Sequence, residues 1–170
     1  MPGLFRRFPN LSPAEWDELR AVVDHRPDVL AVGRGEGALV VAQRDILTVR
    51  QADQWQVMGW HEIQRGGWRS EDQALSWELV DGSRGSVVLS DPGQVPSVFR
   101  ERVQASIVVN EQVTVPDDRG QVIIVGRRNL GTDEPLRWLV EPVGRTNLSD
   151  PWVRDFVVLQ TERIRAEYTG

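Results

Sequence analysis

The sequence predicts an α+β protein that combines an antiparallel β-sheet with N-terminal, middle and C-terminal helices. Short segments of alternating apolar and polar residues are separated by glycine-containing turns, which is typical of antiparallel strands. Three other segments have helical spacing and follow residues that cap helices. The chain of 170 residues favours one domain by its length. We therefore expect a single domain over residues 1–170.

The first helix is predicted over residues 12–26. Ser12 and Glu15 have the spacing of a capping box, and Pro13 stands at the first helical position, where its missing N–H is not needed. An apolar stripe at helical spacing follows, made of Trp16, Leu19, Val22 and Val23. Pro27 is expected to end the helix.

Strand patterns run from Val29 to Leu89, within a core that is expected over residues 28–108 and that also includes the middle helix. The segment GRGEG at residues 33–37 is predicted to be a tight hairpin turn, because strand-like residues follow it where a phosphate-binding loop needs a helix. Asp81-Gly82 is a second hairpin signal. One long strand is expected from Trp55 to Trp68, with Gly66-Gly67 allowing a bend.

The middle helix is expected to start at Asp91-Pro92 and to run to about Val108, with Phe99 in the middle of its apolar stripe. Residues 109–170 then supply a strand pair and a C-terminal helix that is capped by Asp150. The strand pair is expected at residues 121–128 and 136–141, and residues 110–115 have the pattern of a third strand.

The late strands should pack against the last helix. Leu136, Trp138 and Val140 alternate with Arg137, Leu139 and Glu141, so one face of the strand pair is apolar and needs cover. The last helix has a matching stripe through Phe156 and Ile164. A lone hairpin with one helix is too small to be stable by itself. We expect residues 109–170 to extend the earlier sheet within one cooperative unit.

Segments within residues 38–108 resemble bacterial pleckstrin-homology-like (PH-like, GRAM-like) domains. The stretches that carry the resemblance are ALVVAQRDILTV, WHEIQRGGW, ALSWELVDGSRGSVVLSD and VPSVFRERVQASIV. The whole layout is also similar to that of an actinobacterial protein family. The resemblance implies a bent antiparallel sheet or partial barrel that is plugged at one end by a helix. It also implies a binding function, because PH-like domains bind phosphoinositides, peptides or protein partners.

Composition excludes several kinds of chemistry. The chain has no cysteine, which excludes disulfides, cysteine-based metal sites and cysteine nucleophiles. All 20 basic residues are arginine, so lysine Schiff bases and P-loop lysines are excluded as well. A formal net charge of −5 argues against nonspecific binding to nucleic acid or anionic membranes. The sequence shows no targeting or membrane-spanning segment, and we expect a cytoplasmic protein.

Four residues are candidates for partner binding. Trp60 is either an exposed anchor or covered by a helix. Arg127, Arg128 and Arg137 form the densest late basic group, which indicates either phosphate or acidic-peptide binding, or a salt-bridged sheet surface near Glu134 and Glu141. The two histidines, His25 and His61, lack metal-ligand spacing, and we expect no metal or other cofactor.

The predicted function is a non-enzymatic cytoplasmic binding or scaffolding module whose partner is a protein. Two alternatives stay open. One is a small-ligand-binding protein or enzyme that uses a pocket near His61 at the mouth of the barrel. The other is weak binding of anionic lipid or nucleic acid through Arg127, Arg128 and Arg137.

Overall fold

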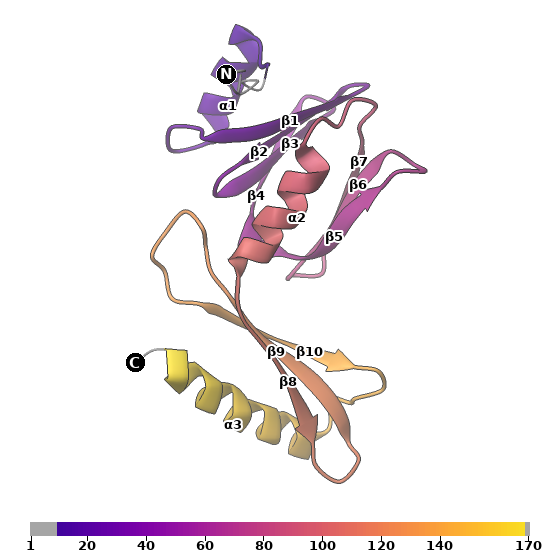
Figure 1. The fold of residues 1–170 in the computed structure, drawn as a ribbon, viewed down its shortest axis with the longest axis vertical. Helices are drawn as coiled ribbons and strands as arrows, with labels where there is room; N and C mark the ends of the chain where they lie inside the picture. The colour runs from indigo at the N-terminus through magenta and orange to yellow at the C-terminus, as the bar shows by residue number, and fades with distance from the viewer. Residues whose placement is uncertain (1–9, 169–170) are drawn as a thin grey trace, which may run out of the picture. The chain divides into compact units, whose positions relative to one another are not determined.

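A computed structural model describes residues 10–168 and has an α+β fold. These residues form three α-helices and ten antiparallel strands (Figure 1). The strands are arranged in three open sheets, and the described residues form no closed barrel. The chain divides into two compact units. The first unit holds residues up to 106 together with residues 129–133, and the second holds residues 107–128 and 134 onward. The prediction of one cooperative domain stays a prediction.

The first unit contains two antiparallel meanders. The first sheet has the order β1-β2-β3-β4 and the second has the order β5-β6-β7. The strands are β1 (Val29–Gly35), β2 (Ala38–Gln43), β3 (Ile46–Gln51), β4 (Gln54–Gly59), β5 (Ile63–Arg69), β6 (Ala74–Leu79) and β7 (Arg84–Val88).

The glycine-rich segment at 33–37 is a hairpin turn, as the sequence predicts. Gly35 pairs with Ala38 across a loop of Glu36 and Gly37, and Gly37 has a φ of 62°. This left-handed conformation is readily adopted by glycine, which has no Cβ. The Asp81-Gly82 turn between β6 and β7 is confirmed as well, with Gly82 at a φ of 86°.

The two sheets of the first unit meet at one corner. Backbone hydrogen bonds of 2.7 and 2.9 Å join Arg34 of β1 to Asp91, just after β7. A Cβ at Gly35 would overlap the carbonyl oxygen of Val88. The missing side chain therefore lets the backbones of the two sheets approach each other closely.

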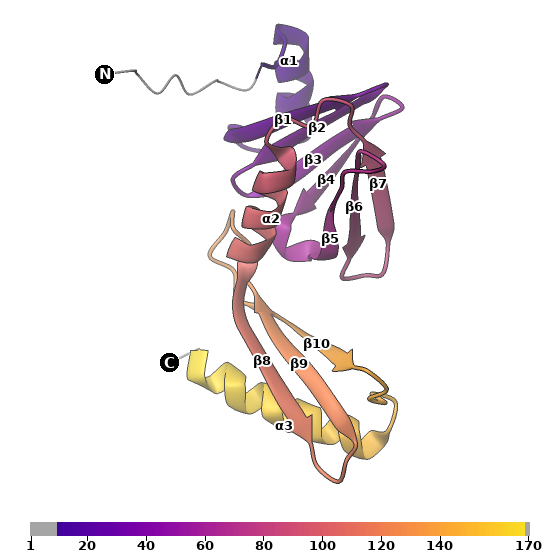
Figure 2. The same ribbon diagram turned by 45° about the vertical axis from the view of Figure 1, so that its right-hand side comes forward.

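The middle helix, α2 (Val95–Ser106), packs against both sheets. Val95 and Phe99 lie in one buried core with residues of both sheets, and Figures 1 and 2 show α2 running alongside them. The helix is shorter than the expected span from Asp91 to Val108. It begins later because the backbone of Asp91 is bonded to Arg34, and it ends earlier because Ile107 begins the next strand.

The expected single strand from Trp55 to Trp68 is wrong, because a 3₁₀ turn η1 (Trp60–Glu62) separates β4 from β5. The Glu62 carboxylate accepts a hydrogen bond from the Gly59 N–H at 2.8 Å, and Trp60 enters the core at this turn. The break lets the chain pass from the first sheet to the second.

The first helix, α1 (Pro13–Val22), starts as predicted with a complete capping box between Ser12 and Glu15. It ends at Val22, four residues before the predicted end at residue 26. Val23 leaves the helix in an extended conformation and is buried in a small core with Leu19 and residues of β2. Burial of Val23 thus ends the helix before Pro27.

An ion pair joins α1 to β1. Nη1 and Nη2 of Arg34 donate to the two carboxylate oxygens of Glu15 at 2.6 and 2.9 Å. The hydrogen bond from Arg34 is the main reason why the pKa of Glu15 falls from 4.5 to about 2, with smaller contributions from Ser12. This pair connects the helix to the first sheet.

A second polar contact joins the chain after α1 to the turn before β3. His25 Nε2 lies 2.6 Å from an oxygen of Asp45, and its Nδ1 lies 3.1 Å from the Arg26 carbonyl. The Arg26 carbonyl and then Asp45 raise the pKa of His25 above its ordinary value. The charged imidazolium is therefore the favoured form in this contact.

The second unit is a three-stranded sheet covered by the last helix. Its elements are β8 (Ile107–Val115), β9 (Gly120–Arg127), β10 (Arg137–Val143) and α3 (Pro151–Tyr168), and the sheet order is β10-β9-β8. Trp138 and Val140 pack with Phe156 and Ile164 in one core, and Figure 2 shows α3 along one face of the sheet. The expected third strand and the helix-covered apolar face are both confirmed.

Candidate functional site

Trp60 is a core residue in this structure. Its side chain is 0% exposed, its Nε1 donates to the Gln43 carbonyl at 3.0 Å, and its ring meets Phe99 of α2 edge to face. Of the two alternatives, the tryptophan covered by a helix is therefore the one observed. A partner cannot reach the ring as an exposed anchor, so Trp60 is not part of the candidate site.

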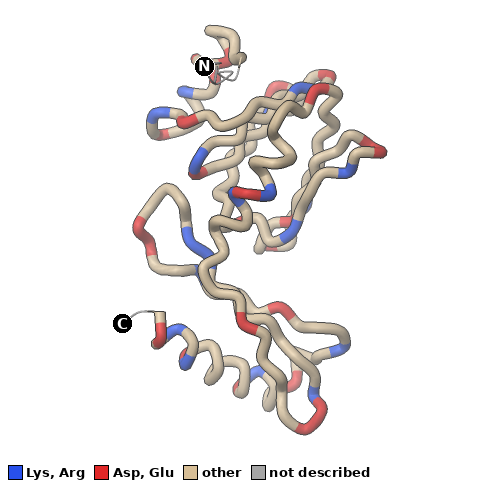
Figure 3. Tube along the Cα trace, viewed as in Figure 1, with Lys and Arg blue, Asp and Glu red and all other residues tan. Residues whose placement is uncertain are grey.

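The late arginines differ in exposure. Arg127 is buried, whereas Arg128 and Arg137 are exposed. Arg127 and Arg137 are direct cross-strand neighbours in β9 and β10, and the register places Glu141 on the same face. Burial lowers the pKa of Arg127, and the Glu141 carboxylate opposes this change. The group is thus a sheet face with charges of both signs, and Figure 3 shows such mixing throughout the described chain.

His61 lies in the η1 turn, against the backbone of Gly59. A Cβ at Gly59 would be 2.5 Å from the imidazole Cε1, so the ring uses space that the glycine leaves open. Glu62 next to it caps the Gly59 N–H. These positions give both side chains a structural role in the turn.

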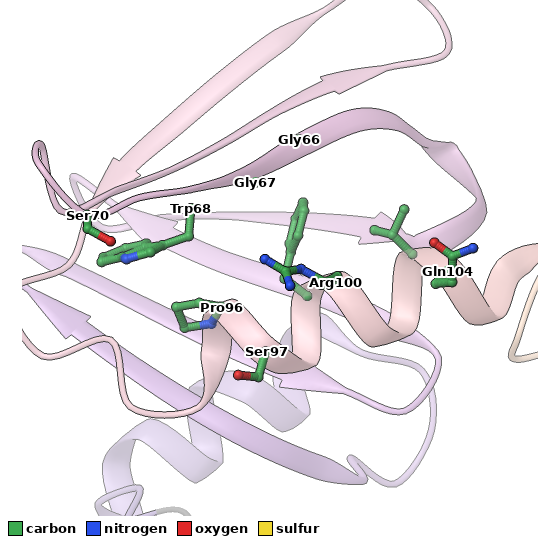
Figure 4. Close-up of a pocket in the computed structure, with 10 residues that line it drawn as sticks. Gly66, Gly67, Trp68, Ser70, Pro96, Ser97, Arg100 and Gln104 are labelled. Carbon is green, nitrogen blue, oxygen red and sulfur yellow. The ribbon is translucent and has the colours of Figure 1, made fainter.

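A groove of about 580 Å³ lies between the edge strand β5 and helix α2. The strand side contributes Gly66, Gly67 and Trp68, with Ser70 in the turn that follows. Figure 4 shows Trp68 facing Pro96 and Arg100 across the groove. The groove therefore joins a strand edge, an aromatic ring and a helix face within the first unit.

The two glycines explain why the strand side of the groove is open. A Cβ at Gly66 would lie 2.8 Å from Cζ of Phe99, so this position faces the core and has no room for a side chain. A Cβ at Gly67 would meet nothing within 4 Å. The middle of β5 thus presents its backbone to the groove, without side chains that would shield it.

The helix side of the groove comes from one stripe of α2. Pro96, Arg100 and Gln104 are four residues apart and follow each other along the helix, and Phe99 and Val103 lie beside them. Phe99 is buried and forms part of the core. The floor of the groove is therefore apolar, and its outer rim is polar.

Arg100 is the charged residue that lines this groove in the described part of the chain. Its side chain is exposed, and it forms no ion pair with any other described residue. The neighbouring Glu101 is paired with Arg102 at 2.6 Å. The guanidinium of Arg100 therefore has its hydrogen-bonding capacity available to a ligand.

The sequence predictions did not include this groove. They treated Gly66-Gly67 as a bend and Phe99 as the middle of the apolar stripe of a helix. The spacing of Pro96, Arg100 and Gln104 and the pair of glycines are both visible in the sequence. Only the folded chain shows that these two segments lie side by side.

Comparisons of the chain with protein-family models, with curated proteins and with solved structures find no match. Among residues 10–168, no cluster of three or more histidine or acidic side chains is arranged to hold a metal ion. No helix in the same residues is long and apolar enough to cross a membrane.

Proposed function

We propose that residues 28–108 form a PH-like core, a bent antiparallel sheet or partial barrel, and that the protein is a non-enzymatic binding module. The order of elements supports the fold proposal. A four-stranded meander is followed by a three-stranded meander and then by a helix that packs against both. The bridge between Arg34 and Asp91 joins the two sheets at one corner, as a bent, partly closed sheet requires.

The groove between β5 and α2 is the proposed binding site. The observation that carries this proposal is the combination of an apolar floor, an open strand edge and an unpaired arginine in one concave surface. Binding sites on proteins are typically concave and largely apolar, with a few polar groups that orient the ligand. A protein partner remains the proposed class of ligand.

A capture experiment with matched variants tests this site. Gln104→Trp places a bulky ring in the groove from an exposed position, and Ala105→Trp places the same ring at the adjacent exposed position outside the groove lining. Circular dichroism and thermal unfolding establish that both variants are folded. Each is immobilised beside the wild-type chain and exposed to a lysate of the cells that produce the protein.

The expected result is a polypeptide that the wild type and Ala105→Trp retain and that Gln104→Trp loses. Its affinity is then measured with the purified partner, where Gln104→Trp should weaken binding by about tenfold or more. Equal retention by all three proteins would show that the groove is not the binding site.

A further inference from the structure

We infer that the partner contributes an extended polypeptide segment, which adds a strand to the open edge of β5 and pairs an acidic side chain with Arg100. This inference rests on the proposed function and names the class of ligand and the way in which it binds. The partner is another protein, and the segment lies within its chain.

The edge of β5 can accept another strand. In the order β5-β6-β7, β5 pairs with β6 alone among the described strands. A strand edge presents a row of backbone N–H and C=O groups that can hydrogen-bond to an incoming strand. Alternate residues of β5 turn these groups away from β6, and the segment from Gly66 to Trp68 that lines the groove is part of this edge.

The surroundings of this edge suit an extended chain. Gly67 points to the face of β5 opposite Gly66, and a Cβ there would meet nothing within 4 Å, so side chains of an added strand that fall on this face have room. Successive side chains of a strand point to opposite faces. Alternate side chains of the added segment would therefore enter the groove and contact Trp68, Pro96 and Val103.

The charge of the groove selects an acidic segment. Arg100 faces the groove from the α2 side and has no carboxylate partner among the described residues. A planar guanidinium binds a carboxylate through two parallel hydrogen bonds. A nucleic acid backbone is disfavoured, because it requires several cations and this groove has one in a chain with a net charge of −5.

The first experiment selects peptides on the purified full-length chain. The probe is a phage-displayed library of random peptides of about 10 residues, long enough to follow a strand of the length of β5. We expect the selected peptides to share an acidic residue among apolar positions. Synthetic peptides with free and amidated C-termini are then compared, and both forms should bind equally if the carboxylate comes from a side chain.

Charge-reversal variants test the role of Arg100. Arg100→Glu should weaken binding of the selected peptides by about 10- to 100-fold, as expected for loss of a charge-assisted hydrogen bond. Arg26→Glu is the matched control, because Arg26 is also exposed but lies outside the groove. Its effect should stay within about twofold. Equal effects of the two variants would overturn the role of Arg100.

Hydrogen exchange tests the mode of binding. Added peptide should slow amide exchange within residues 66–69 of β5 at the N–H groups that point away from β6, because a new strand bonds to that edge. Peptides that bind without such protection would overturn strand addition, and binding lost on amidation would show that a terminal carboxylate is recognised instead.

If no peptide is selected but capture of a partner still depends on Gln104, this inference fails and the proposed function stands. If capture is also independent of Gln104, the proposed function fails with it.

Discussion

Replacing Phe99 with alanine should lower the free energy of unfolding by about 4 kcal/mol, near the middle of the range that is typical when a buried phenylalanine is changed to alanine. Phe99 is 2% exposed. Its ring centroid lies 5.9 Å from that of Trp60 with an interplanar angle of 79°, an edge-to-face pair that adds about 0.5–1.5 kcal/mol to simple burial.

The site around Phe99 has little capacity to collapse after truncation. Gly66 opposite the ring has no side chain to fill the space, and Trp60 is held by its hydrogen bond to the Gln43 carbonyl. A cavity that stays open is the costly case for a large-to-small substitution. Phe99→Leu is the matched control and should cost less than about 2 kcal/mol, because it retains most of the buried volume.

Urea unfolding followed by far-ultraviolet circular dichroism measures the free energy of unfolding of the three proteins. The midpoint should fall in the order wild type, Phe99→Leu, Phe99→Ala, with unchanged slopes. A loss below about 1 kcal/mol for Phe99→Ala would contradict the role of α2 in closing the core between the two sheets.

The remaining predictions concern pH and the extent of the cooperative unit. The pair with Arg34 lowers the pKa of Glu15 to about 2, so the contribution of Glu15 to stability is present above pH 4.5 and is lost as the pH falls toward 2. Glu15→Gln should lower the free energy of unfolding by about 1–2 kcal/mol at pH 7 after solvent screening. If the stability of the wild type and of the variant fell identically on acid titration, this prediction would be refuted. The pKa of His25 is raised, so His25→Gln should destabilise the protein below about pH 6.5 and lose this effect as the pH rises through the raised pKa, whereas a pH-independent difference would contradict the assignment. A fragment that ends at residue 115 should be insoluble or lack a sharp thermal transition, because β8 would lose β9 and α3, which cover its apolar residues. A soluble fragment with a sharp thermal transition would show that the single-domain prediction is wrong.

The sequence by itself determined the features that depend on a few neighbouring residues. Ser12 and Glu15 predict the start of α1, and both cap it as expected. Gly37 predicts the first hairpin, because the turn requires a positive φ. The alternation in β10 and the stripe of α3 predict correctly which faces pack together. In each case the deciding interaction spans a short stretch or follows directly from a periodic pattern.

The tertiary structure decided what is buried and which distant segments meet. Trp60 is in the core and Arg127 is buried, although the residues around them in the sequence do not distinguish these positions from exposed ones. The groove between β5 and α2 exists because Gly66 and Arg100, 34 positions apart, come from a strand and a helix that pack side by side. Burial is set by atoms that arrive from elsewhere in the chain, whereas sequence patterns record the preferences of local backbone and side chains. That difference is why the start of α1 and the hairpin turns were predictable and the candidate site was not.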